Sequence, residues 1–113
     1  MDSLNKLKII YKALDDKQAI DIKMIDIREI SYIADYFVIA SASNINQMQA
    51  FTDNIETELI KEKIHLPKIE GKRDSSWLLI DLGDVIVNLF LDDQRHFYDL
   101  EKLWMDGKNV SFN

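Results

Sequence analysis

Three aspartates are the side chains of this sequence best suited to chemistry on phosphates. Asp81 and Asp84 flank a predicted tight turn, and Asp35 lies at the start of a predicted strand. Two or three carboxylates brought together could hold Mg²⁺ for phosphoryl or nucleotidyl transfer. A metal pair, however, usually takes carboxylates from alternate positions of one strand, and no predicted strand contains Asp-x-Asp. The sequence therefore favours turn-forming or partner-contacting aspartates, and a small metal-dependent nucleotidyltransferase is the alternative.

Histidine, serine and cysteine give weaker signals. Neither His65 nor His96 has a second histidine or a carboxylate four residues further on, so a metal site would need ligands from elsewhere. No serine lies in a Gly-x-Ser-x-Gly motif. The chain has no cysteine, which excludes disulfides and thiolate metal sites. The sequence thus predicts no catalytic residue, no metal site and no cofactor.

A strand, a small polar turn and a helix start follow one another at residues 34–47, an order in which many phosphate sites are built. The turn, Ser41-Ala42-Ser43, has no glycine that would let the backbone approach a phosphate, and no Gly-Lys-Ser/Thr follows. Ser43 or Asn44 is instead suited to cap the helix. We therefore interpret this turn as structural.

The elements that position these residues follow from hydrophobic spacing. Apolar residues at helical spacing predict helices over 4–14, from 43 or 44 to about 63, and from 92 or 93 to 104. Alternating or continuous apolar runs predict strands over 19–27, 34–40, 68–70, 78–82 and 85–91. This order predicts a single α/β domain with a mixed β-sheet flanked by helices. We expect the domain to span residues 1–106 and the tail, residues 107–113, to be loosely held.

Acidic residues are concentrated in the last third of the chain. The formal charge is −6, and residues 77–106 alone have a balance of −5. Such a surface repels phosphate backbones and attracts basic proteins, so direct nucleic-acid readout is disfavoured. A solvated acidic rim without a partner is the simpler alternative. The N-terminus has no apolar signal segment and no run approaches the ~20 apolar residues of a membrane span, so we expect a cytoplasmic protein without membrane contact.

Residues 77–104 combine two apolar strands with several aromatic side chains. Both strands are apolar at odd and even positions alike, so both of their faces should be covered, by the chain's own helices or by a partner. Phe97 is best explained as core. Trp77 follows a polar loop and Tyr98 lies one position off the apolar stripe of its helix, so both are candidates for a partly exposed interface.

Several segments resemble the ribosomal silencing factor family, also called the Iojap family. They are IADYFVIASAS at 33–43, the predicted helix over 47–56, Glu70-Gly71, WLLIDLGDVIVNLF at 77–90 and RHFYDLEKLW at 95–104. The likeness spans about residues 4–106. Two positions depart from the family: Asn88 replaces a common histidine, and Ala42 replaces a common glycine.

The resemblance implies a nucleotidyltransferase-like fold that lacks the catalytic carboxylates, and hence a protein that is not an enzyme. It also implies a translational repressor that binds the large ribosomal subunit through large-subunit ribosomal protein fourteen. Binding there would sterically block association with the small subunit and lower translation under nutrient limitation.

The resemblance places the contact surface in the last third of the chain. Apolar side chains would supply buried area, and carboxylates would face basic side chains of the ribosomal protein. The partner-binding residues that we predict are Trp77, Leu79, Asp81, Arg95, Tyr98, Asp99, Glu101, Leu103 and Trp104. Self-association through the apolar hairpin face, giving a homodimer or a scaffold, is the second alternative.

Overall fold

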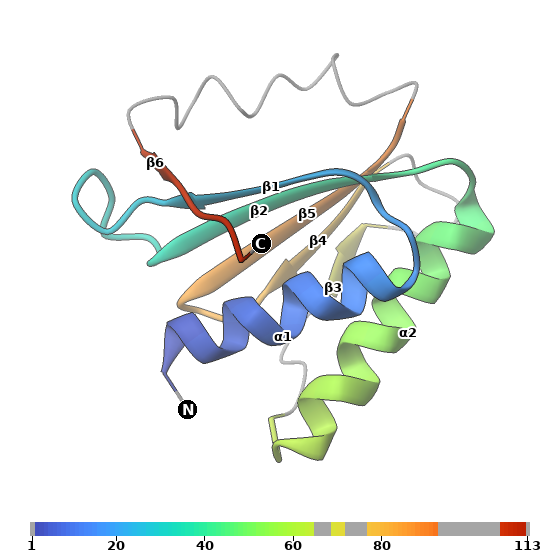
Figure 1. Ribbon diagram of the computed structural model, residues 1–113, viewed down its shortest axis with the longest axis horizontal. Coiled ribbons are helices and arrows are strands. Elements are labelled where there is room, and N and C mark those ends of the chain that lie inside the picture. Colours follow the sequence, from blue (N-terminus) through green and yellow to red (C-terminus); the bar gives the residue numbers. More distant parts are fainter. Residues whose placement is uncertain (1, 65–68, 72–76, 93–106, 113) are drawn as a thin grey trace.

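The computed structural model describes residues 2–64, 69–71, 77–92 and 107–112. Two helices, α1 (Ser3–Asp16) and α2 (Ile45–Lys61), lie on the same face of one β-sheet (Figure 1). The six strands are β1 (Ile20–Asp26), β2 (Tyr36–Ala42), β3 (Ile69–Gly71), β4 (Trp77–Asp81), β5 (Val85–Leu91) and β6 (Lys108–Asn109). The predicted α/β class is confirmed. The predicted helix from 92 or 93 to 104 lies outside the described residues.

The sheet has the order β3-β4-β5-β2-β1-β6 and mixes strand directions. β5 pairs with β2 in parallel, whereas the other neighbouring pairs are antiparallel. A parallel pair needs a crossover connection, and the chain between β2 and β5 provides it with α2, which packs on both strands. The apolar hairpin of β4 and β5 therefore lies near the middle of the sheet.

Both helices begin at capping side chains. Asp2 accepts a hydrogen bond from the backbone N–H of Asn5 at 2.9 Å, and Asn44 accepts one from that of Gln47 at 2.8 Å. These bonds satisfy first-turn donors that have no acceptor within the helix. Of the two caps that we predicted, Ser43 and Asn44, the structure uses Asn44.

Within the described ranges, no helix has the length and apolarity needed to cross a membrane.

The central strands are buried on both faces. Along β5, Val87 and Leu89 pack with the helix-side core and are fully buried. Phe90 points to the other face, where it packs with Phe37 and Ile39 of β2, and it is only 1% exposed. This confirms the prediction, made from apolar residues at odd and even positions, that both faces are covered.

The turn between β4 and β5 depends on a glycine. Gly83 has a φ of 86°, a conformation that side chains with a Cβ rarely adopt. Its backbone N–H donates to Oδ1 of Asp81 at 2.8 Å, and the N–H of Leu82 donates to the carbonyl of Val85 at 3.0 Å. Asp81 is therefore a turn-forming aspartate, as predicted.

The described part of the tail, residues 107–112, contacts the rest of the domain. Residues 108–109 form β6, which pairs with β1, and the N–H of Val110 donates to the carbonyl of Met24 at 2.9 Å. The ring of Phe112 then lies edge-on to Tyr11 of α1, with 5.7 Å between the ring centroids. The sequence did not predict β6, because a two-residue edge strand held by main-chain bonds leaves no periodic pattern. The division into a domain of residues 1–106 and a loosely held tail stays a prediction.

Candidate partner-binding surface

β4 brings three of the predicted contact residues to one face of the sheet. Leu78 and Ile80 are buried in the core beneath the helices. Because side chains alternate along a strand, Trp77, Leu79 and Asp81 face the opposite side. Trp77 and Leu79 are half-buried, and Asp81 is exposed. The structure thus groups these three residues, and their contact with a partner stays a prediction.

The neighbouring strand extends this face. The residues of β5 opposite Trp77, Leu79 and Asp81 are Phe90, Asn88 and Ile86, in that order. Phe90 is buried, whereas Ile86 is half-buried and packs with the same cluster as Trp77. We call the three half-buried residues Trp77, Leu79 and Ile86 the apolar strip.

Two carboxylates border the apolar strip. Asp81 follows it along β4, and Glu70 of β3 lies opposite Leu79. Both are exposed. An apolar centre with a polar rim is the usual anatomy of a protein–protein interface, and here the rim is acidic.

Trp77 is tied to the centre of the sheet by its indole nitrogen. Nε1 of Trp77 donates a hydrogen bond to Oδ1 of Asn88 at 3.0 Å. Asn88 is 1% exposed, so the acceptor lies beneath the surface to which Trp77 contributes. In the sequence, Asn88 stands out only as a departure from the family pattern, and no role was predicted for it. The signal that could have revealed it is a single amide within the otherwise apolar run VIVNLFL.

The other predicted contact residues lie outside the residues that the structure describes. They are Arg95, Tyr98, Asp99, Glu101, Leu103 and Trp104. Their contribution to the surface stays a prediction from the resemblance.

A metal-dependent nucleotidyltransferase, the alternative function, would use Asp35, Asp81 and Asp84. Each of these aspartates has a hydrogen-bond or ion-pair partner within the chain. Oδ2 of Asp35 accepts from the hydroxyl of Ser3 at 2.7 Å. Asp84 binds the ammonium of Lys6 at 3.1 Å, and Asp81 closes its own turn. In the described part of the chain, no three His, Asp or Glu side chains gather in a way that could hold a metal ion. These contacts give the three aspartates structural roles.

The turn after β2 is closed by the chain itself. The N–H of Ser43 donates to Oε1 of Gln47 at 2.6 Å, and Nε2 of Gln47 donates to the carbonyls of Lys17 and Gln18 at 3.2 and 3.3 Å. Gln47 therefore takes up the N–H of Ser43 and ties the turn to the residues that follow α1. This agrees with the structural interpretation of the turn.

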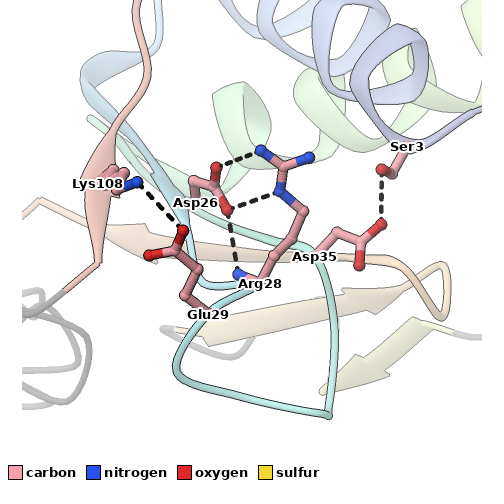
Figure 2. A network of polar contacts seen from close by, with 6 residues as sticks. All are labelled: Ser3, Asp26, Arg28, Glu29, Asp35 and Lys108. Atoms are coloured by element: carbon pink, nitrogen blue, oxygen red, sulfur yellow. Dashed lines mark hydrogen bonds and ion pairs between the residues drawn. The ribbon is translucent and has the colours of Figure 1, made fainter.

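A polar network that we did not predict joins the end of β1 to β6 (Figure 2). Arg28 donates from Nε and Nη2 to the two carboxylate oxygens of Asp26, at 3.0 and 2.7 Å. The hydrogen bond from Arg28 lowers the pKa of Asp26. Nearby, the ammonium of Lys108 lies 3.4 Å from Oε1 of Glu29. The Lys108–Glu29 pair connects the tail with the β1–β2 connection, which are far apart in the sequence.

The fold first defines a class: a small α/β domain whose mixed sheet has two helices on one face and the half-buried apolar strip on the other. The chain belongs to the ribosomal silencing factor family: the family described as "Ribosomal silencing factor during starvation" matches it over residues 1–113. The resemblance predicted from the sequence is confirmed.

Individual relatives agree with this assignment. The chain is 42% identical to the Ribosomal silencing factor RsfS of Bacillus subtilis over 107 residues, 95% of this chain and 91% of that protein. It is 32% identical over 105 residues to the mouse protein named "Mitochondrial assembly of ribosomal large subunit protein 1", covering 87% of this chain and 44% of the mouse protein. A crystal structure of a Chromobacterium violaceum protein superposes with a TM-score of 0.87 at 28% identity, covering 99% of this chain and 92% of that one.

Proposed function

We propose that this protein is a translational repressor that binds the large ribosomal subunit in the cytoplasm. Large-subunit ribosomal protein fourteen is the proposed docking partner, and occupancy of that site would prevent the small subunit from joining. Membership of the ribosomal silencing factor family supports a ribosome-associated silencing role. The name of the mouse relative, which refers to the large subunit, favours that subunit as the target.

The observation that carries the proposal is the apolar strip with its acidic border. Trp77, Leu79 and Ile86 are half-buried, so each still has surface to lose when a partner covers it. An indole can bury on the order of 200 Å² and is among the side chains most enriched at the energetic centres of interfaces. A partner that covers this strip would therefore gain most of its affinity at Trp77.

Charge determines which kind of partner fits. Asp81 and Glu70 border the strip, and the whole chain has a formal charge of −6. A basic ribosomal protein is attracted to such a surface, whereas the phosphates of ribosomal RNA are repelled. The proposed contact is therefore with protein on the subunit surface rather than with RNA.

The mode of action that we propose is steric and requires no chemistry. The domain measures about 34 × 34 × 27 Å along its principal axes. A body of this size on the joining surface of the large subunit would keep the small subunit away. Inhibition would then follow occupancy, with no turnover.

Co-sedimentation with purified large ribosomal subunits tests the proposal. Truncating Trp77→Ala or Leu79→Ala should weaken binding about tenfold or more, with the circular dichroism spectrum retained. Ile60→Ala is the matched control, because Ile60 is an exposed apolar residue, 50% exposed, on α2 across the sheet. Added small subunits should join fewer large subunits in the presence of the wild-type protein. The proposal fails if wild-type binding does not exceed that of a variant with the strip removed, or if joining proceeds unhindered.

A homodimer formed through the same strip is the competing use of this surface. Sedimentation equilibrium at micromolar concentration separates the two, because a dimer would dissociate when Trp77 is truncated. A dimer that persists in the presence of large subunits would contradict the proposed docking.

A further inference from the structure

Asn88 is an amide in a place where apolar side chains would be expected. It lies in the middle of β5, opposite Leu79 on one side and Ile39 on the other. It is 1% exposed, and the only other buried polar side chains in the described residues are Ser41 and Thr52. Burial of an amide is unfavourable unless its polar atoms are hydrogen-bonded.

The hydrogen bond to Trp77 satisfies only half of this amide. An indole N–H can only donate, so the atom that it meets must be the carbonyl oxygen of Asn88, which fixes the orientation of the amide. The NH₂ group then points elsewhere, and Nδ2 is buried without a hydrogen-bond partner among the described residues. An apolar side chain of similar size is therefore expected to give a fold of equal or greater stability.

We explain the incompletely hydrogen-bonded Asn88 by what it does for its neighbour, Trp77. Trp77 lies in the second strand from the sheet edge, half-buried, and its indole is the largest group of the apolar strip. The bond to Asn88 favours a rotamer in which the indole nitrogen points toward the buried amide.

We propose that Asn88 is a positioning residue that holds the indole of Trp77 in the orientation the ribosomal partner binds. This inference rests on the proposed function and deepens it. Holding a side chain in its bound orientation before binding removes an entropic cost that association would otherwise carry. The expected contribution is about two- to tenfold in affinity.

The hydrogen bond between Trp77 and Asn88 is tested without ribosomes, by the indole N–H signals in a ¹H–¹⁵N spectrum. The chain has two tryptophans, so Trp77→Phe identifies the signal of Trp77. In Asn88→Leu this signal should shift, and its exchange with solvent should become about tenfold faster or more, because the hydrogen bond is lost. Asn88→His keeps an acceptor nitrogen at a similar position and should preserve the signal. Thr52→Val, which removes a buried hydroxyl from α2 on the other side of the sheet, should leave it unchanged.

The consequence for binding is tested with the same variants and purified large subunits. Asn88→Leu should bind about two- to tenfold more weakly while its thermal midpoint is equal to or above that of the wild type. Asn88→His should bind within about twofold of the wild type. Asn88→Val serves the same purpose if leucine prevents folding, since valine suits a strand.

Two results would overturn the inference. One is an indole signal that is unchanged in Asn88→Leu and Asn88→Val. The other is a lost indole bond with wild-type affinity. If instead the wild-type protein itself fails to bind large subunits, the proposed function fails, and the spectrum recorded without ribosomes distinguishes that failure from a failed anchor.

Discussion

The ammonium of Lys6 lies 3.1 Å from a carboxylate oxygen of Asp84 and joins the first helix to the β4–β5 turn, 78 residues further along the chain. The backbone carbonyl of Asp84 also accepts from the N–H groups of Asp35 and Tyr36, at 2.8 and 3.1 Å. Asp84 thus connects α1, the start of β2 and the start of β5. Ile86 of the apolar strip, in β5, follows shortly after Asp84.

The first prediction concerns the Lys6–Asp84 ion pair. The two side chains are 18% and 30% exposed, so the pair is partly shielded from solvent. Lys6→Met keeps the aliphatic stem and removes the charge, and should lower the free energy of unfolding by about 1 kcal/mol in urea denaturation. Lys61→Met is the control, because the Lys61–Glu58 pair is 64% and 33% exposed and should contribute almost nothing. Equal effects of the two changes would contradict the assigned role.

The second prediction concerns acid stability. The hydrogen bond from Arg28 holds the pKa of Asp26 below its ordinary value of 3.8. A depressed folded-state pKa gives stability that is present above the unfolded-state pKa and is lost as pH falls through the folded-state pKa. Arg28→Gln should therefore raise the pKa of Asp26 toward 3.8, measured by carboxyl NMR titration. It should also destabilise the protein at neutral pH, and this difference should shrink below about pH 4. A difference that is constant down to pH 2 would contradict the linkage.

The third prediction isolates backbone strain at Gly83. A Cβ added there would meet no atom within 4 Å, so any cost of Gly83→Ala comes from its φ of 86°. The change should destabilise the fold by about 1 kcal/mol, measured by thermal or urea unfolding. Gly83→Asn is the matched comparison, because asparagine tolerates a positive φ better than alanine and should cost less. A Gly83→Ala variant as stable as the wild type would mean that the turn adopts another conformation.

The fourth prediction concerns the tail. Phe112 is half-buried against Tyr11, and Lys8 lies 5.9 Å from the centre of its ring. Phe112→Ala should lower the free energy of unfolding by about 1–2 kcal/mol, less than for a fully buried ring. Lys108→Ala should change it by less than about 0.5 kcal/mol, because the Lys108–Glu29 pair is exposed. Faster amide exchange along β1 in the Phe112 variant would show that the tail protects this strand.

Local chemistry made much of the fold predictable. Apolar spacing located both described helices, Asn44 was recognised as a possible cap, and the run from 85 to 91 was correctly predicted to be buried on both faces. Each of these depends on residues near one another in the chain. The grouping of Trp77, Leu79 and Asp81 can equally be predicted from the sequence, because alternate residues of one strand share a face.

Contacts between distant segments were not predictable in this way. The tail strand forms through main-chain bonds to β1, which any sequence can make, so no side-chain pattern marks it. The Glu29–Lys108 pair likewise depends on where the tail lies, whereas the neighbouring Arg28–Asp26 pair is local (Figure 2).

The sequence by itself determined the α/β class, the positions of most helices and strands, and the acidic character of residues 77–106, since these follow from composition and short-range periodicity. Only the tertiary structure decided that Asn88 lies beneath Trp77. That contact depends on the register between β4 and β5, and a shift by one residue would turn either side chain to the opposite face.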